Sequence, residues 1–195
     1  MYSIKENSIW KLEIKNSRFI CYLFKISNKD EFNNILNDIK NQYKDATHYC
    51  YGYVTKDSQK ASDDGEPGGT AGMPILNVIN SNNLINTGAI VIRYFGGIKL
   101  GAGGLVRAYT KVVNEAIKNN TLVELIDGIN ITIEFDYNNL KEIDYILKDS
   151  VILDKKFDNN IIYSVNTTDD VLGNLKSKVN KYVINEKIYI EKPAK

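Results

Sequence analysis

Cysteine, histidine and long apolar segments are all scarce in this chain of 195 residues. Two cysteines, Cys21 and Cys50, and one histidine, His48, supply too few N and S ligands for a structural zinc site. A cytosolic chain of this length needs no disulfide to supplement its core, so we expect both cysteines to be reduced, buried and metal-free. The apolar runs, such as residues 89–92, are strand-sized and fall far short of the ~20 residues of a membrane helix.

The start of the chain lacks the basic segment, apolar stretch and small-residue cleavage site of a secretory signal. We therefore expect a cytoplasmic protein without membrane contact. Hydrophobic residues make up 43% of the chain and charged residues 25%, a balance that excludes a disordered tail and indicates a globular protein with its own core.

Acidic residues are absent from one long segment, which runs from Pro67 to Asn114. Residues 1–120 hold 15 Lys and Arg against 11 Asp and Glu, a net charge of +4, whereas residues 121–195 hold 10 against 13, a net charge of −3. Phosphate-binding surfaces need local rather than global positive charge. The asymmetry therefore favours a polyanionic partner for the first part of the chain.

Hydrophobic periodicity predicts a mixture of strands and helices in residues 1–120. Glycine, proline and aspartate between Lys56 and Gly72 predict a loop in which nothing regular persists. The expected elements are strands at 10–14 and 18–26 joined as a hairpin, a helix at 30–43, a strand at 47–55, a short helix at 74–79, a strand at 89–95 and a helix at 105–118.

The pattern restarts after Asn120 and gives the order βαββαβ, the ferredoxin-like arrangement. Its expected elements are a strand at 129–135, a helix at 140–147, strands at 151–157 and 161–165 joined at Asn159 and Asn160, a helix at 171–179 and a strand at 187–190. The sequence thus predicts an α+β protein with two domains, residues 1–120 and residues 121–195.

The glycine-rich segment before the helix at 105–118 carries the pattern of an anion site. Its glycines leave backbone N–H groups open to a partner at a helix start, while Arg107 and Lys111 lie four apart on one helical face. The alternative is a tight turn with solvated basic residues. Neither the P-loop nor the dinucleotide glycine pattern is complete. The candidate binding residues are Arg93, Lys99, Gly101, Gly103, Gly104, Arg107 and Lys111.

Two further groups of residues are candidates for catalysis or ion binding. His48 and Cys50 share one face of a predicted strand and could serve as base and nucleophile, although core packing explains the same pattern. Asp63, Asp64 and Glu66 could hold Mg²⁺ near a phosphate. We favour the alternative in which the two aspartates form a turn or cap and Glu66 pairs with Arg93 or Arg107. No cofactor is expected.

Several long motifs, in order across residues 15–120, resemble the signature blocks of the YigZ/IMPACT family. The blocks are Arg18-Phe19, residues 46–50, residues 63–74 and residues 93–109. Two positions depart from the family pattern: Tyr49 stands where the family usually has Asn, and Gly68 where it usually has Ser. These departures put any catalytic role of the two positions in doubt.

The resemblance implies a first domain similar to domain IV of elongation factor G, a ribosomal protein domain 2-like βα fold, and a ferredoxin-like second domain similar to domain V. Those domains act on the ribosome, so the resemblance favours contact with RNA or a ribosomal site. Eukaryotic members regulate an amino-acid-starvation kinase, which makes a protein partner a further option.

Two functional hypotheses follow. The first is a non-enzymatic, translation-associated factor that binds RNA or a ribosomal site through Arg93, Lys99, Arg107 and Lys111. The second is a small hydrolase or phosphate-ligand enzyme that uses His48, Cys50 and the loop of Asp63, Asp64 and Glu66.

Overall fold

The computed structural model describes residues 1–192 and divides the chain into two compact units, Met1–Val123 and Glu124–Lys195. The buried apolar residues form clusters that lie within one unit or the other. The boundary expected from the sequence, after Asn120, lies a few residues earlier. Independent folding of the two segments stays a prediction.

The first unit is built on a five-stranded antiparallel sheet with the strand order β2-β3-β6-β4-β5. The central strand β6 is buried along its whole length except at Tyr94, which explains its uninterrupted apolar run. The strands are β2 (Ser8–Ile14), β3 (Ser17–Lys25), β4 (His48–Val54), β5 (Gln59–Ser62) and β6 (Thr87–Tyr94), and a short strand β1 (Tyr2–Ile4) precedes them.

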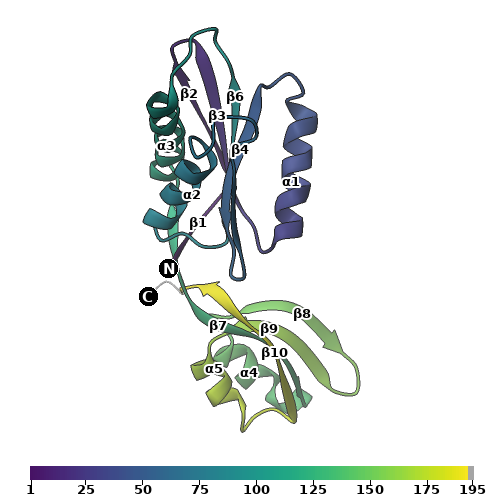
Figure 1. Ribbon diagram of the computed structural model, residues 1–195. Helices are drawn as coiled ribbons and strands as arrows, with labels where there is room; N and C mark the ends of the chain where they lie inside the picture. Colours follow the sequence, from purple (N-terminus) through teal and green to yellow (C-terminus); the bar gives the residue numbers. More distant parts are fainter. Residues whose placement is uncertain (193–195) are drawn as a thin grey trace. The chain divides into compact units, whose positions relative to one another are not determined.

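Helices cover both faces of this sheet (Figure 1). Helix α1 (Lys29–Gln42) packs on one face, and α2 (Gly72–Ser81) and α3 (Ala102–Lys118) pack on the other. Successive residues of a strand point to opposite faces, so Ile90 contributes to the α1 side and Val91 to the side of α2 and α3. The two cores therefore share one sheet.

The predicted hairpin between β2 and β3 is confirmed. Ile14 pairs with Ser17, which leaves Lys15 and Asn16 as a two-residue turn. Both turn residues have positive φ angles, 46° and 64°, as the hairpin turn that matches strand twist requires. The tip of this hairpin lies against the glycine-rich segment after β6.

Two sequence-based expectations for the first unit are wrong in detail. The segment Lys56 to Gly72 is not free of regular structure, because β5 pairs with the edge of β4 there. Helix α3 begins at Ala102 rather than at Leu105, so Gly103 and Gly104 lie inside its first turn. In both places tertiary packing overrides a weak local preference.

The second unit has the ferredoxin-like fold predicted from the sequence. Its strands run antiparallel in the order β10-β7-β9-β8, and α4 and α5 contribute to a single core with the sheet. The first and last strands are longer than expected. The elements are β7 (Leu122–Phe135), η1 (Tyr137–Asn139), α4 (Leu140–Ile146), β8 (Val151–Phe157), β9 (Ile161–Thr167), α5 (Asp169–Leu175) and β10 (Lys181–Glu191).

Across residues 1–192, every helix is too short or too polar to cross a lipid bilayer.

Candidate functional site

The glycine-rich segment that joins β6 to α3 is held in place by the hairpin between β2 and β3. Ser17 Oγ accepts hydrogen bonds from the Gly96 N–H, at 3.2 Å, and from Arg93 NH2, at 3.3 Å. A Cβ atom on Gly96 would lie 2.1 Å from the carbonyl carbon of Asn16. The first residues of the turn therefore have a fixed path that only glycine allows.

The N-terminus of α3 offers backbone N–H groups without helical partners. The first intrahelical bond runs from the Leu105 N–H to the Gly101 carbonyl, at 2.9 Å. The N–H groups of Ala102, Gly103 and Gly104 precede that bond, and no side chain caps the helix. Gly101, the N-cap, has a φ of 70°. These N–H groups and the positive end of the helix dipole suit a phosphate.

Two exposed cations, Lys99 and Arg107, lie near this helix start, and a third, Lys111, lies further along the helix. Lys99 lies in the turn, whereas Arg107 and Lys111 project from the outer face of α3, where they line a shallow hollow of about 590 Å³. Arg107 NH1 lies 3.5 Å from the position that a Cβ on Gly103 would take, so its guanidinium lies beside the first turn. Among residues 1–192, none of the three forms an ion pair.

Arg93 has a different environment from these three residues. It is only 5% exposed, and its NH1 donates to Glu66 Oε1 at 2.6 Å. Its guanidinium also lies 5.4 Å from the ring centre of Phe19 and 5.5 Å from that of Phe95. The Nε atom is buried and has no hydrogen-bond partner. Arg93 therefore belongs to a buried ion pair, in which Glu66 balances its charge.

Glu66 also accepts a hydrogen bond from Tyr109, which in turn contacts Cys50. Tyr109 Oη donates to Glu66 Oε1 at 2.8 Å, and the Cys50 thiol lies 3.3 Å from Tyr109 Oη and 2.9 Å from the Asp63 carbonyl oxygen. Burial raises the pKa of Cys50 to about 12, and the neighbouring acidic residues add to the rise. The thiol is therefore protonated at neutral pH, which does not suit a nucleophile.

The hydrogen-bond contacts of His48 lie with the acidic loop rather than with this thiol. Its Nδ1 lies 2.8 Å from the Asp64 carbonyl oxygen, and its Nε2 lies 3.9 Å from Glu66 Oε2. Within residues 1–192 no hydrogen bond joins His48 to Cys50. The two residues lie two positions apart on β4 with separate partners, and their role as base and nucleophile stays a prediction.

The aspartates of the acidic loop bind backbone N–H groups. Asp63 accepts from Gly69 at 2.8 Å, from Ala71 at 2.9 Å and from Gly72 at 2.8 Å. Burial alone would raise the pKa of Asp63, but these three bonds outweigh it and lower the pKa. Asp64 accepts from the Tyr49 N–H at 2.7 Å. The loop is therefore held by its own carboxylates.

Within residues 1–192 no three His, Cys, Asp or Glu side chains lie together in a way that could hold a metal ion. The expectation that the protein uses no metal or cofactor stays a prediction.

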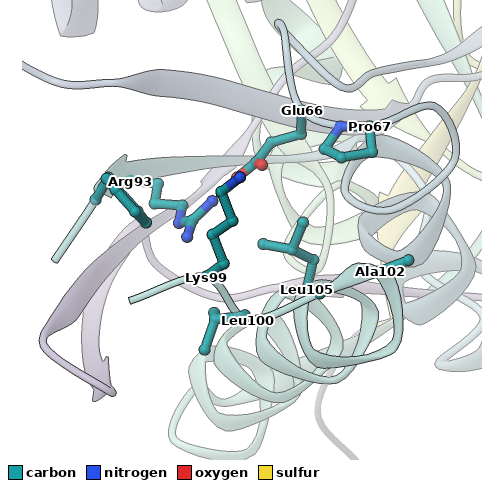
Figure 2. Close-up of a pocket in the computed structure, with 9 residues that line it drawn as sticks. Glu66, Pro67, Arg93, Lys99, Leu100, Ala102 and Leu105 are labelled. Atoms are coloured by element: carbon teal, nitrogen blue, oxygen red, sulfur yellow. The ribbon is translucent and has the colours of Figure 1, made fainter. Parts of the chain in front are cut away.

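The structure adds a pocket that sequence reasoning missed. Its volume is about 310 Å³, and in Figure 2 the polar ends of Glu66 and Arg93 point into the space that Leu100 and Leu105 border. The sequence did contain one signal for this pocket: Phe95 is an apolar residue beside a glycine-rich turn, where polar residues are usual. The lining residues are Glu66, Pro67, Arg93, Phe95, Lys99, Leu100, Gly101, Ala102 and Leu105.

Comparison with known proteins agrees with the motifs and the fold. Residues 15–117 match the Impact N-terminal domain. The IMPACT family member YvyE of Bacillus subtilis is 42% identical over 158 residues, which cover 76% of this chain and 73% of that protein. YigZ of Escherichia coli is 37% identical over 140 residues, 69% of each chain. A crystal structure described as that of a hypothetical protein covers 90% of this chain and 89% of its own, with 30% identity and a TM-score of 0.69.

The matched domain covers more than half of the chain, and the identity to YvyE extends over three quarters of it. The resemblance read from the sequence motifs is therefore confirmed, and the chain belongs to the IMPACT family.

Proposed function

We propose that this protein is a non-enzymatic, translation-associated factor that binds RNA or a ribosomal RNA site through its first unit. The contact surface, here called the α3 basic surface, consists of Lys99, Arg107, Lys111 and the N–H groups of residues 102–104. One observation carries the proposal: two exposed cations that form no ion pair within residues 1–192, Lys99 and Arg107, lie at an uncapped helix N-terminus, and Lys111 extends the row along the same helix face.

The charge distribution supports a phosphate-rich partner. No acidic residue occurs from Pro67 to Asn114. In the fold one carboxylate lies near each group of cations: Glu115 lines the hollow of Arg107 and Lys111, and Glu66, which pairs with Arg93, lines the pocket of Lys99. Arg107 lies beside the free N–H groups and can share a phosphate with them, as guanidinium groups and helix N-termini commonly do. Arg93 was also expected on this surface, but its pairing with Glu66 gives it the role of positioning the turn.

The resemblance to domains IV and V of elongation factor G supports a place in translation. The hydrolase hypothesis has weaker support, because the Cys50 thiol is protonated and His48 binds elsewhere. RNA binding therefore accounts for the exposed groups of the α3 basic surface, which catalysis by His48 and Cys50 leaves unexplained.

The test is fluorescence anisotropy with a labelled single-stranded RNA at several salt concentrations. Contact with three or four phosphates gives a log–log salt slope of roughly −2 to −3, and loss of one contact reduces its magnitude by about 0.7. We expect Arg107→Gln to lose one contact, and Arg107→Glu or Lys99→Glu to weaken binding further. Co-sedimentation of the same variants with ribosomes extends the test to the ribosomal site.

Two charge reversals elsewhere serve as controls. Lys44→Glu changes an exposed lysine after α1, on the opposite side of the sheet, and Lys176→Glu changes an exposed lysine of the second unit. Both should bind RNA like the wild type. Absent or salt-independent binding by the wild type, or equal behaviour of Arg107→Glu and the controls, contradicts the proposal.

A further inference from the structure

The pocket beside the α3 basic surface has mainly apolar walls and one polar side. Pro67, Phe95, Leu100 and Leu105 supply apolar wall, whereas Glu66 contributes a carboxylate (Figure 2). Small-molecule sites usually measure about 300–1,000 Å³, so about 310 Å³ lies at the lower end of that range. The pocket has room for one ring system and not for a chain of them.

The polar side of this pocket keeps unused hydrogen-bonding capacity. Arg93 is 5% exposed and its Nε lacks a partner. Glu66 Oε1 accepts from Arg93 and Tyr109, but no hydrogen bond within residues 1–192 reaches Oε2, whose near neighbour is His48 Nε2 at 3.9 Å. Arg93 Nε is sealed from solvent, whereas Glu66 Oε2 can accept a hydrogen bond from a ligand. The pocket therefore favours a ring with a donor group on its edge.

Groups that suit an anion also line this pocket. Lys99, Gly101 and Ala102 line it, and they belong to the turn and the first residues of α3. Phe95 is 46% exposed and presents a ring on which a planar group can stack. Apolar wall, a polar edge and an uncapped helix start thus line one pocket, and these are the groups that a base and its phosphate need.

We infer that this pocket binds one unpaired nucleotide. The base stacks against Phe95 with its polar edge toward Glu66 and Arg93, and the phosphate lies at Lys99 and the N-terminus of α3. The inference rests on the proposed function and narrows it, because a base held in a pocket must be unpaired and unstacked, as in single-stranded RNA. A free 5′-nucleotide has the same chemistry.

The test compares two single-stranded RNAs of equal length and charge, one intact and one with abasic positions. Stacking of one base on an aromatic side chain makes the intact RNA bind roughly tenfold more tightly to the wild type. Phe95→Ala removes the stacking surface, so it should lose this preference yet keep its affinity for the abasic RNA. Ala102→Phe fills the pocket from an exposed position and should also lose the preference. Thermal melts check that each variant is folded.

Two matched variants separate this inference from the proposed function. Ile98→Ala truncates a side chain of the same turn with similar exposure, 47%, that does not line the pocket, and it should keep the preference. Arg107→Glu should weaken binding of both RNAs. If neither RNA binds the wild type in a salt-dependent manner, the proposed function fails as well.

A third arm uses adenosine and guanosine 5′-monophosphate, followed by NMR line shifts. One outcome is that the wild type binds a mononucleotide, Phe95→Ala does not, and the wild type shows no preference for intact over abasic RNA. That outcome supports the nucleotide site and assigns it to a free nucleotide. Equal affinity for intact and abasic RNA together with no mononucleotide binding overturns the inference, while the α3 basic surface can still bind phosphates.

Discussion

Gly96 fixes where the glycine-rich turn leaves the sheet. A Cβ there would clash with the peptide group between Asn16 and Ser17: 2.1 Å from Asn16 C, 2.2 Å from Asn16 O and 2.5 Å from Ser17 N. These atoms belong to a hairpin turn and cannot rotate away as a flexible side chain would. Ser17 also accepts the Gly96 N–H, so moving the two segments apart breaks that bond.

We therefore expect Gly96→Ala to lower the free energy of unfolding by about 1–3 kcal/mol, the usual cost of overpacking. Gly173→Ala is the control, because Gly173 lies within α5 with open space around its Cβ position. That change should raise the free energy of unfolding by about 0.5–1 kcal/mol. Urea unfolding followed by circular dichroism measures both, and wild-type stability of Gly96→Ala would contradict the argument.

Sequence reasoning reached the partners of individual residues only in part. It allowed Glu66 to pair with either Arg93 or Arg107, and the structure shows Arg93. The choice depends on β6 lying at the centre of the sheet, which buries Arg93 beside the acidic loop and leaves Arg107 exposed. The contact between Cys50 and Tyr109 joins positions 59 residues apart, and no local pattern reveals it.

At the scale of elements, Asp63 links the end of β5 to the start of α2. Helix α2 has no side-chain cap at Ala71. The carboxylate of Asp63, eight residues earlier in the sequence, caps the helix instead, because it accepts hydrogen bonds from the N–H groups of Ala71 and Gly72. One carboxylate thus satisfies donors at the helix start and also fixes the loop at Gly69.

We expect Asp63→Asn to lower the free energy of unfolding at pH 7 by about 1.5–3 kcal/mol, the range for hydrogen bonds to a charged group. The pKa of Asp63 is lowered in the folded protein, so its contribution is complete above the unfolded value of about 3.9 and is lost as pH falls through the folded pKa. The difference between wild type and Asp63→Asn should therefore shrink as the pH is lowered from 7 to about 3.

Urea titrations at several pH values between 3 and 7 measure this difference. Asp38→Asn, a change at an exposed position of α1, should unfold like the wild type throughout. A difference for Asp63→Asn that stays constant down to pH 3 would show that its charge is not responsible.

Helices and strands with strong periodicity were predictable from the sequence, whereas short or glycine-containing ends were not. The βαββαβ order and the first hairpin follow from apolar spacing and turn residues. Strand β5 has no apolar alternation in its sequence. It could not be predicted, because only its pairing with β4 defines it. The first turn of α3 contains Gly103 and Gly104, which have low helix propensity, yet burial of Leu105 and the helix face beyond it extends the helix to Ala102.

At the scale of the whole molecule, charge and core both divide along the chain. Residues 1–120 carry a net charge of +4 and residues 121–195 a net charge of −3. The first unit contains the exposed cations of the α3 basic surface, and the second supplies a separate apolar core. An acidic second unit attracts polyanions weakly, so RNA affinity should reside in the first.

Limited proteolysis tests whether the two units fold on their own. Lys118 is exposed at the end of α3, and a tryptic cut after it leaves the buried clusters of both units intact. Hydrogen bonds just after Lys118 should slow this cleavage, because they hold the backbone in place. The Asn120 side chain donates to the Glu6 carbonyl at 2.7 Å and to Ser8 Oγ at 3.0 Å, and the Thr121 carbonyl accepts from the Lys5 N–H. We expect slow cleavage to give two lasting fragments, 1–118 and 119–195, that mass spectrometry identifies and circular dichroism shows to be folded. Degradation to small peptides, with no fragment ending near residue 118, would show that each core depends on the other.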